Sequence, residues 1–150
     1  MEAIIRRAKS SDIPHLVELL RDLFSIEADF EFNAGVQKQG LFMMLQSPET
    51  RCIMVAETDK IVAGMCTGQL VVSTAKGGFS GLIEDMVIRS EYRGKGLGSR
   101  LLDAVQKWCF SSGARRIQLL ADKNNKKALR FYSKCGWQHT QLICLRKTAD

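Results

Sequence analysis

The chain has 150 residues, of which 45% are hydrophobic and 25% are charged, and it carries a formal net charge of +6 at pH 7. This length and composition indicate one globular domain over residues 1–150 and exclude a disordered or fibrous protein. No apolar run approaches the roughly 20 residues of a membrane-spanning helix, and the N-terminal residues lack a secretory signal, so we expect a cytoplasmic protein with no membrane partner.

The cysteines and histidines argue against metal and triad chemistry. The five cysteines include no C-x-x-C pair, and several lie in apolar runs, where cysteine packs as a small hydrophobic residue. With only His15 and His139 available, we expect no structural zinc site, no other metal site and no Ser-His-Asp triad. The positive charge is mostly dispersed, so a nucleic-acid partner is not expected, and its few clusters suit a polyanionic cofactor.

The first third of the chain predicts one strand and two helices. Residues 3–8 are β-prone, and Ser11 is a suitable N-cap for apolar residues at helical spacing over 13–24. A second helix is expected over 36–46. The segment between the helices places carboxylates beside two phenylalanines, which would attract an amine as well as water. These carboxylates are Glu27, Asp29 and Glu31.

The middle of the chain predicts three antiparallel strands. Two β-rich runs, over 51–57 and 61–72, are joined by a hairpin turn at 58–60. A glycine-rich segment then allows another reversal into an apolar run at 82–88. In a regular strand, Glu84 and Met86 would share one face, and Asp85 and Val87 the other, so only one carboxylate would face a cleft.

The last third adds two helices and two strands. An amphipathic helix is expected to begin at Ser99, followed by a strand over 117–121 parallel to the one before the helix. Another helix is expected over 125–136, and a last strand or bent pair over 137–147. The predicted order is β-α-α-β-β-β-α-β-α-β, an α/β (α+β) fold with a mixed, mostly antiparallel sheet flanked by helices.

The loop between the 82–88 strand and the next helix is suited to a phosphate. Gly94, Gly96 and Gly98 leave the backbone accessible, and the following helix begins with unpaired N–H groups and a partial positive charge. Arg93 and Lys95 add charge at its rim. Neither the dinucleotide fingerprint nor the P-loop pattern matches this spacing.

Two separated motifs resemble those of the GCN5-related N-acetyltransferase (GNAT) superfamily. The stretch Arg93-Gly94-Lys95-Gly96-Leu97-Gly98 matches its Arg/Gln-x-x-Gly-x-Gly/Ala loop at every specified position. Its later motif, Asn-x-x-Ala-x-x-x-Tyr followed by Gly-Phe/Trp, is matched by Asn125, Ala128, Tyr132, Gly136 and Trp137. The stretch Ile83-Glu84-Asp85 is similar to the diamine or spermidine/spermine acetyltransferase branch.

The resemblance implies acetyl-CoA as co-substrate and, by analogy alone, a homodimer. In the family the glycine loop binds the pyrophosphate, and the strand at Met86–Val87–Ile88 opens so that its backbone binds the pantetheine arm. The cofactor-binding residues implied are Met86, Val87, Ile88, Arg93, Gly94, Lys95, Gly96, Leu97, Gly98, Ser99, Asn125, Ala128 and Tyr132. Asn125 is also suited to cap its own helix.

Acyl transfer to an amine needs a proton acceptor and a proton donor. Glu84 is the candidate that accepts the amine proton through water, or orients the ammonium, although an isolated strand Glu is also an ordinary surface residue. Tyr132 is the candidate donor to the leaving thiolate, because an ordinary phenol, with a pKa of about 10, is protonated at neutral pH; alternatively it packs in an apolar stripe. Glu27, Asp29 and Glu84 are the expected acceptor-binding residues.

We therefore expect an acetyl-CoA-dependent N-acetyltransferase that acts by direct transfer on a small-molecule primary amine, such as a polyamine or amino-acid-like compound. A peptide or protein lysine or N-terminal acetyltransferase is the alternative within enzymes. From another class, a non-catalytic coenzyme A sensor or a basic nucleic-acid-binding domain stays open.

Overall fold

The structure is a computed structural model that describes residues 2–27 and 29–149. The chain divides into two compact units, Met1–Leu119 and Leu120–Asp150. The expectation of a single domain stays a prediction. Among the described residues, no helix is both long and apolar enough to span a membrane.

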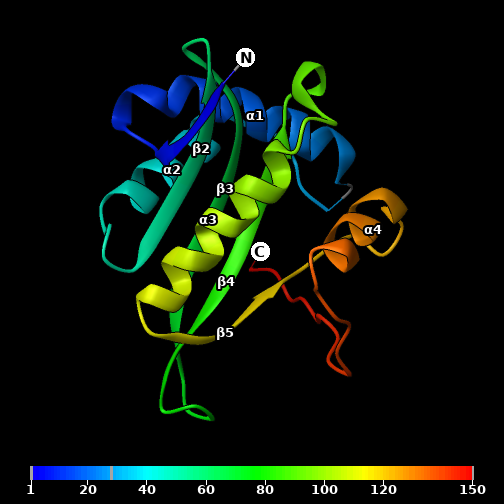
Figure 1. The fold of residues 1–150 in the computed structure, drawn as a ribbon. Helices are drawn as coiled ribbons and strands as arrows, with labels where there is room; N and C mark the ends of the chain where they lie inside the picture. Colours follow the sequence, from blue (N-terminus) through cyan, green and yellow to red (C-terminus); the bar gives the residue numbers. More distant parts are fainter. Residues whose placement is uncertain (1, 28, 150) are drawn as a thin grey trace. The chain divides into compact units, whose positions relative to one another are not determined.

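Among its described residues, the first unit contains five strands, three α-helices and two short 3₁₀ helices, and Figure 1 shows their arrangement. The strands are β1 (Ala3–Arg7), β2 (Arg51–Thr58), β3 (Ile61–Ser73), β4 (Gly78–Ile88) and β5 (Ala114–Leu119). The helices are η1 (Ser10–Asp12), α1 (Ile13–Ile26), α2 (Ala34–Leu45), η2 (Ser90–Tyr92) and α3 (Leu97–Ser111). The α3 helix begins two residues before the expected Ser99.

The five strands form one sheet in the order β1-β2-β3-β4-β5. Neighbours are antiparallel except β4 and β5, which are parallel and joined through α3. The mixed, mostly antiparallel sheet expected from the sequence is confirmed. At the β2–β3 hairpin, Asp59 and Lys60 both have positive φ, as a two-residue turn of type I′ requires.

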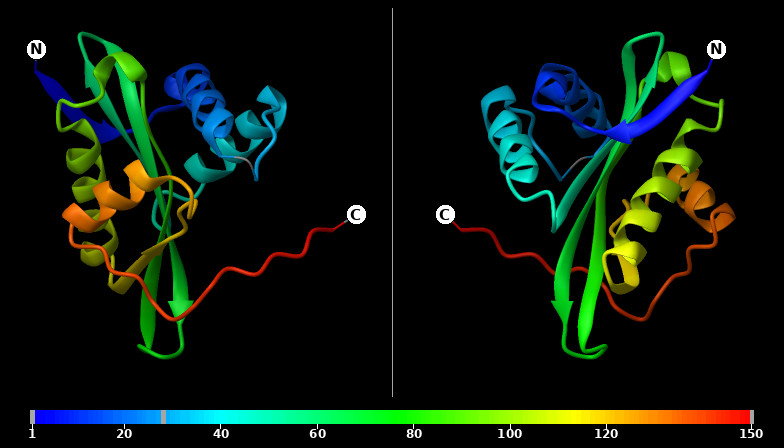
Figure 2. Two further views of the ribbon diagram at one scale, coloured as in Figure 1. Left: turned by 90° about the vertical axis from the view of Figure 1, so that its right-hand side faces the viewer. Right: turned by 60° about the vertical axis from the view of Figure 1, so that its left-hand side comes forward.

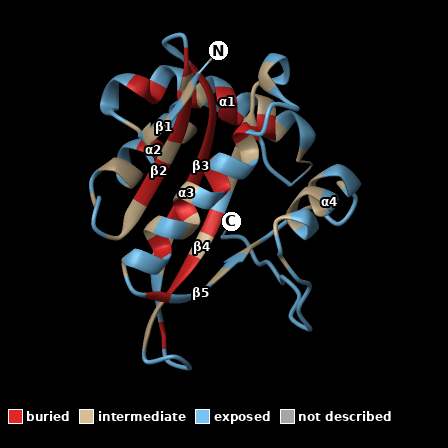
Figure 3. Ribbon diagram, in the orientation of Figure 1, coloured by how far each residue is buried: buried red, intermediate tan, exposed pale blue. Residues whose placement is uncertain are grey.

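Helices α1 and α2 cover one face of the sheet, and α3 covers the other (Figure 2). On the first face, the helical spacing of α1 buries Leu16, Leu19 and Leu20 against strand residues such as Val55 and Met65. Buried residues accordingly concentrate along β2 and β3 and on the inner sides of the helices (Figure 3).

Close packing of α3 on the other face depends on strand glycines. A Cβ added at Gly68 would lie 2.7 Å from Val105 Cγ1, and one at Gly81 would lie 2.7 Å from Cys109 Sγ. Real Cβ atoms do not approach other atoms so closely, so the distance of α3 from the sheet requires glycine at both positions.

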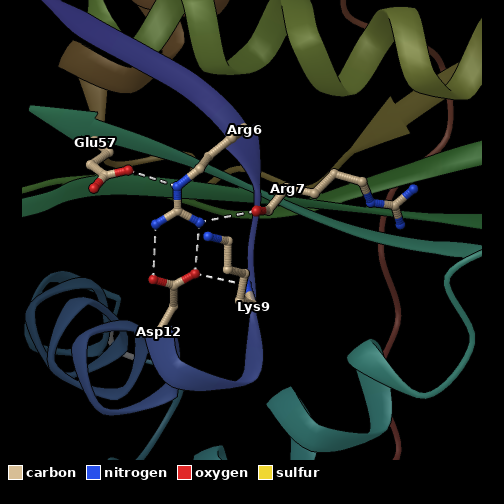
Figure 4. Close-up of polar contacts among 5 residues, drawn as sticks. All are labelled: Arg6, Arg7, Lys9, Asp12 and Glu57. Carbon is tan, nitrogen blue, oxygen red and sulfur yellow. Dashed lines mark hydrogen bonds and ion pairs between the residues drawn. The ribbon is translucent and has the colours of Figure 1, made fainter. Parts of the chain in front are cut away.

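An ion-pair network connects β1 to the start of α1 (Figure 4). Arg6 donates from Nη1 and Nη2 to the Asp12 carboxylate at 2.8 and 3.0 Å, and from Nε to Glu57 Oε2 at 2.7 Å. The Lys9 amide also donates to Asp12, at 2.7 Å. These contacts lower the pKa of the buried Asp12 carboxyl, and the hydrogen bond from Arg6 is the largest cause.

The second unit contains the helix α4 (Lys126–Lys134). Asn125 Oδ1 accepts a hydrogen bond from the Ala128 amide at 3.1 Å, so the expected helix cap is confirmed. The strand expected over 137–147 does not form, because residues 137–149 are irregular. Three apolar side chains there, Leu142, Ile143 and Leu145, are 77%, 82% and 86% exposed. A strand forms only by pairing with a neighbouring strand, and residues 137–149 form no such ladder.

Candidate active site

A bulge in β4 shapes the candidate site. Thr67 of β3 pairs with Glu84, and Met65 pairs with Val87, so Cys66 on β3 stands opposite two residues, Asp85 and Met86. Asp85 has a φ of +54°, a conformation that non-glycine residues rarely adopt. The regular alternation expected over residues 84–87 is therefore interrupted, and the two neighbouring carboxylates have different surroundings.

Asp85 is the carboxylate that faces the protein interior. Its side chain is half-buried, and its Oδ2 lies 3.5 Å from Thr67 Oγ1. The Thr67 hydroxyl donates more closely to the Glu84 carbonyl, at 3.0 Å, so it contributes little to the Asp85 charge. Burial, and secondarily the charges of Glu84 and Glu27, raise the pKa of Asp85 to about 6.

Asp85 lines a cavity of about 390 Å³ on the α1/α2 face of the first unit. The wall is mainly apolar, and a few polar side chains interrupt it, which is the usual character of a small-molecule site. The apolar part consists of Leu20, Phe24, Val36, Gly40, Leu41, Met43 and Met44, and the polar part of Gln37, Arg51, Gln69 and Asp85.

The three carboxylates expected to bind the acceptor, Glu27, Asp29 and Glu84, differ in their positions relative to the cavity. Glu84 is exposed and is not among the described residues that line the cavity. Glu27 follows α1 and is close enough to contribute to the raised pKa of Asp85, whereas Asp29 is exposed. No simple sequence signal identifies Asp85 as the inward carboxylate, because the bulge and the positive φ are not encoded by a glycine.

Past Asp85, one edge of β4 is released from the sheet. The parallel ladder with β5 ends at the pair Ile83–Leu119, whereas Val87 and Ile88 are still paired with β3. Main-chain groups of residues 86–88 on the β5 side therefore lie beyond the last ladder pair. The binding of a pantetheine arm by Met86–Val87–Ile88 stays a prediction.

The glycine loop follows directly. Gly94 and Gly96 have φ of +75° and +80°, and an added Cβ would meet nothing within 4 Å at either position. Glycine is thus needed there for backbone conformation, and the space around it is open. Arg93 Nε donates to the Ile88 carbonyl at 2.9 Å, which ties the loop to the end of β4.

The start of α3 fits an anionic group. Gly96 is the N-cap residue and provides no side-chain hydrogen bond to the helix. Ser99 does not replace it, because its hydroxyl donates to the Gly96 carbonyl at 3.0 Å. The first-turn amides at Leu97, Gly98 and Ser99 therefore have no side-chain cap, and exposed Arg93 and Lys95 lie beside them, as a pyrophosphate would require.

The remaining predicted residues lie in the second unit. Tyr132 is half-buried, with its ring 5.3 Å from that of Phe131 and 6.1 Å from that of Trp137 between centroids. Asn125 and Ala128 form the start of the same helix. The structure thus brings Asn125, Ala128 and Tyr132 together, and their relation to β4 and the glycine loop stays a prediction.

Two further features concern the metal-ligating side chains and the cysteines. Residues 2–27 and 29–149 contain no group of three or more His, Cys, Asp or Glu side chains arranged to hold a metal ion. The five cysteines are all free thiols, and burial raises the pKa of both Cys52 and Cys109 to about 11, so these two are poor nucleophiles.

Comparisons with known proteins agree with this architecture. A protein of Bacillus subtilis (strain 168) with the provisional name ribosomal protein bS18-alanine N-acetyltransferase is 28% identical over 137 residues, covering 91% of this chain and 82% of that protein. The crystal structure of glucosamine-6-phosphate N-acetyltransferase from Arabidopsis thaliana superposes with a TM-score of 0.80 at 25% identity, with 100% of both chains covered.

A further solved structure, the aminoglycoside N-acetyltransferase AAC(6')-Iy with a coenzyme A bisubstrate analogue, has a TM-score of 0.83 at 15% identity over 100% of both chains, which shows a shared fold. None of these three similar proteins is a diamine acetyltransferase. The sequence model of the acetyltransferase (GNAT) family matches residues 1–137. The chain therefore belongs to the acetyltransferase (GNAT) family and is an acyltransferase enzyme.

Proposed function

We propose that the protein transfers an acetyl group from acetyl-CoA directly to a primary amine held in the α1/α2 cavity. The observation that carries the proposal is the arrangement of β4. Within four consecutive residues, 85–88, this strand presents a carboxylate to a mainly apolar cavity and then an edge beyond the β5 ladder that leads to the glycine loop. The amine acceptor and acetyl-CoA would therefore meet along β4.

The first-turn amides of α3 would hold the pyrophosphate, with Arg93 and Lys95 adding charge. The backbone of residues 86–88, which lies beyond the β5 ladder, would hold the pantetheine arm and supply an N–H to the thioester oxygen. Support comes from two solved structures of one protein of the same fold, the aminoglycoside N-acetyltransferase AAC(6')-Iy, which are complexes with coenzyme A or with an analogue that contains it.

We assign the acceptor carboxylate to Asp85 instead of Glu84. An amine arrives as an ammonium and must lose a proton before its nitrogen can attack the thioester carbon. A half-buried carboxylate with a pKa near 6 holds that proton better than an ordinary exposed one. The new C–N bond then forms, the C–S bond breaks, and Tyr132 is the proposed donor of the proton that the departing thiolate takes.

A protein N-terminus is the second candidate acceptor. It is favoured by one observation, that the Bacillus subtilis relative is named for acetylation of a ribosomal protein alanine. The cavity volume of about 390 Å³ and its mainly apolar wall support a small molecule better, because they suit a compact ligand more than an extended chain.

The proposal is tested by measuring thiol release from acetyl-CoA with small amines, amino acids and an alanine-terminated peptide, together with calorimetry of coenzyme A binding. We expect binding and turnover with at least one small amine. Binding without turnover of any acceptor would indicate a coenzyme A sensor, and absence of binding would contradict the whole proposal. Light scattering of the same sample tests the homodimer that family analogy suggests.

A further inference from the structure

The cavity of the proposed acetyltransferase contains two charged side chains of opposite sign. Asp85 enters from the β4 bulge, and Arg51, the first residue of β2, lies on the wall of the same cavity. Among the described residues, neither side chain forms an ion pair within 4 Å, with the other or with any third residue. One cavity therefore offers both an anion and a cation for a ligand.

The Arg51 guanidinium is fixed in place. Its Nη1 donates to the Met43 carbonyl at 2.8 Å, near the C-terminal end of α2, and its main-chain amide donates to the Ser47 carbonyl at 2.9 Å. In the described part of the chain, the bond from Nη1 to the Met43 carbonyl is the one hydrogen bond that the guanidinium makes. Its other N–H groups are therefore available to an anionic oxygen.

The sheet register sets the spacing of the two charges. Arg51 pairs with Gln69 of β3, and Asp85 contacts Thr67, two residues earlier on that strand. Because β3 lies between their strands, two strand spacings of about 4.8 Å and two residues of about 3.4 Å separate the backbones of Arg51 and Asp85 by roughly 12 Å. Both side chains line the same cavity without forming an ion pair with one another, so one short molecule can contact both.

From this placement we infer that the acceptor is a zwitterion, a free amino acid with an apolar side chain. Its ammonium would bind Asp85, its carboxylate would bind Arg51, and its side chain would contact the wall formed by Leu20, Phe24, Met43 and Met44. A polyamine would bring a second ammonium toward Arg51, and a peptide N-terminus would lack the adjacent carboxylate. The inference rests on the proposed function, because it names the substrate of that site.

The test compares three acceptors that share a side chain: phenylalanine, phenylalanine amide and 2-phenylethylamine, with the same series for leucine. We expect at least a tenfold lower KM for the amino acid than for its amide. Arg51→Gln should raise the KM for the amino acid at least tenfold and change that for the amide less than twofold, and Arg51→Lys should be intermediate. Arg116→Gln, an exposed arginine of β5, is the matched control and should change neither value.

The outcomes separate the two claims. If the amides or the amines are acetylated as efficiently as the amino acids by the wild-type enzyme, the zwitterion inference is wrong and the acetyltransferase proposal stands. If acetyl-CoA is bound but no acceptor in the panel is acetylated, both are wrong. The comparison of acceptors with the wild-type enzyme tests the zwitterion inference even if the Arg51 variants fail to fold.

Discussion

Asp85 illustrates how one residue can combine strain and electrostatic cost at a candidate site. It holds a φ of +54° in a strand, and burial raises its carboxyl pKa to about 6. Both features oppose folding at neutral pH, and proteins often retain such features where a function needs them. Nothing in the stretch Ile83-Glu84-Asp85 reveals which carboxylate would be buried, so sequence reasoning selected Glu84.

Replacing Asp85 with Asn should stabilise the protein at neutral pH. The folded-state pKa is raised above the ordinary value near 3.8, so the wild-type carboxyl favours folding below that value and loses this contribution as the pH rises through about 6. We expect Asp85→Asn to melt a few degrees above wild type at pH 7.5, with a smaller difference at pH 4. Thermal melts of the variant and the wild type at both pH values measure the difference in melting temperature. A smaller gain at pH 7.5 than at pH 4 would refute the prediction.

Asp12 should have the opposite pH dependence. Arg6 lowers its folded-state pKa, so its contribution is present above about 3.8, the ordinary value, and is lost as the pH falls through the lowered one. We expect Asp12→Asn to cost about 2 kcal/mol at pH 7, because Arg6 loses a bidentate partner. Urea unfolding at pH 7 and pH 3 should show the cost shrinking at acid pH. Asp103→Asn, in an exposed pair with Lys107, is the control and should change stability by less than about 1 kcal/mol.

At the scale of elements, hydrophobic periodicity predicted α1 and α3 well, because each buries one stripe of apolar side chains. The antiparallel run of β2, β3 and β4 and the parallel β4–β5 pair also followed from the sequence. The bulge did not, since bulges arise from pairing between strands and not from either strand alone. The absent last strand shows the same limit, because a strand forms by pairing with another strand, and the composition of a run alone does not determine that pairing.

The packing of α3 on the sheet gives an element-scale prediction. Gly68→Ala should destabilise the protein by about 1–3 kcal/mol, because its new Cβ would lie 2.7 Å from Val105 Cγ1 and force α3 outward. Gly40→Ala is the matched control: it lies in α2 with nothing within 4 Å of an added Cβ, so it should raise stability by about 0.5–1 kcal/mol. Chemical unfolding measures both, and a neutral Gly68→Ala would mean that α3 is not tightly packed.

At the scale of the molecule, the proposed chemistry draws on both compact units. The cavity, the bulge and the glycine loop belong to the first unit, and Tyr132 belongs to the second. The sequence motifs predicted each residue group separately, since a motif records local spacing. Distances between the groups depend on tertiary packing that no local pattern encodes.

Tyr132→Phe tests the contribution of the second unit. The substitution removes the hydroxyl donor and keeps the ring that packs against Phe131 and Trp137. We expect the maximal rate to fall about 100-fold or more while the dissociation constant of coenzyme A changes less than threefold. Equal losses in rate and affinity would assign Tyr132 to packing.

Asp85 is the carboxylate proposed to take the proton of the acceptor amine, and the choice of Asp85 over Glu84 is the central claim. The most direct measurement compares Asp85→Asn with Glu84→Gln, its exposed neighbour, by steady-state thiol release, with coenzyme A affinity measured by calorimetry for each. We predict that Asp85→Asn lowers kcat/KM for the acceptor at least 100-fold with unchanged coenzyme A affinity, and that Glu84→Gln lowers it less than fivefold. The reverse order, with Glu84→Gln the more damaging, would contradict the assignment.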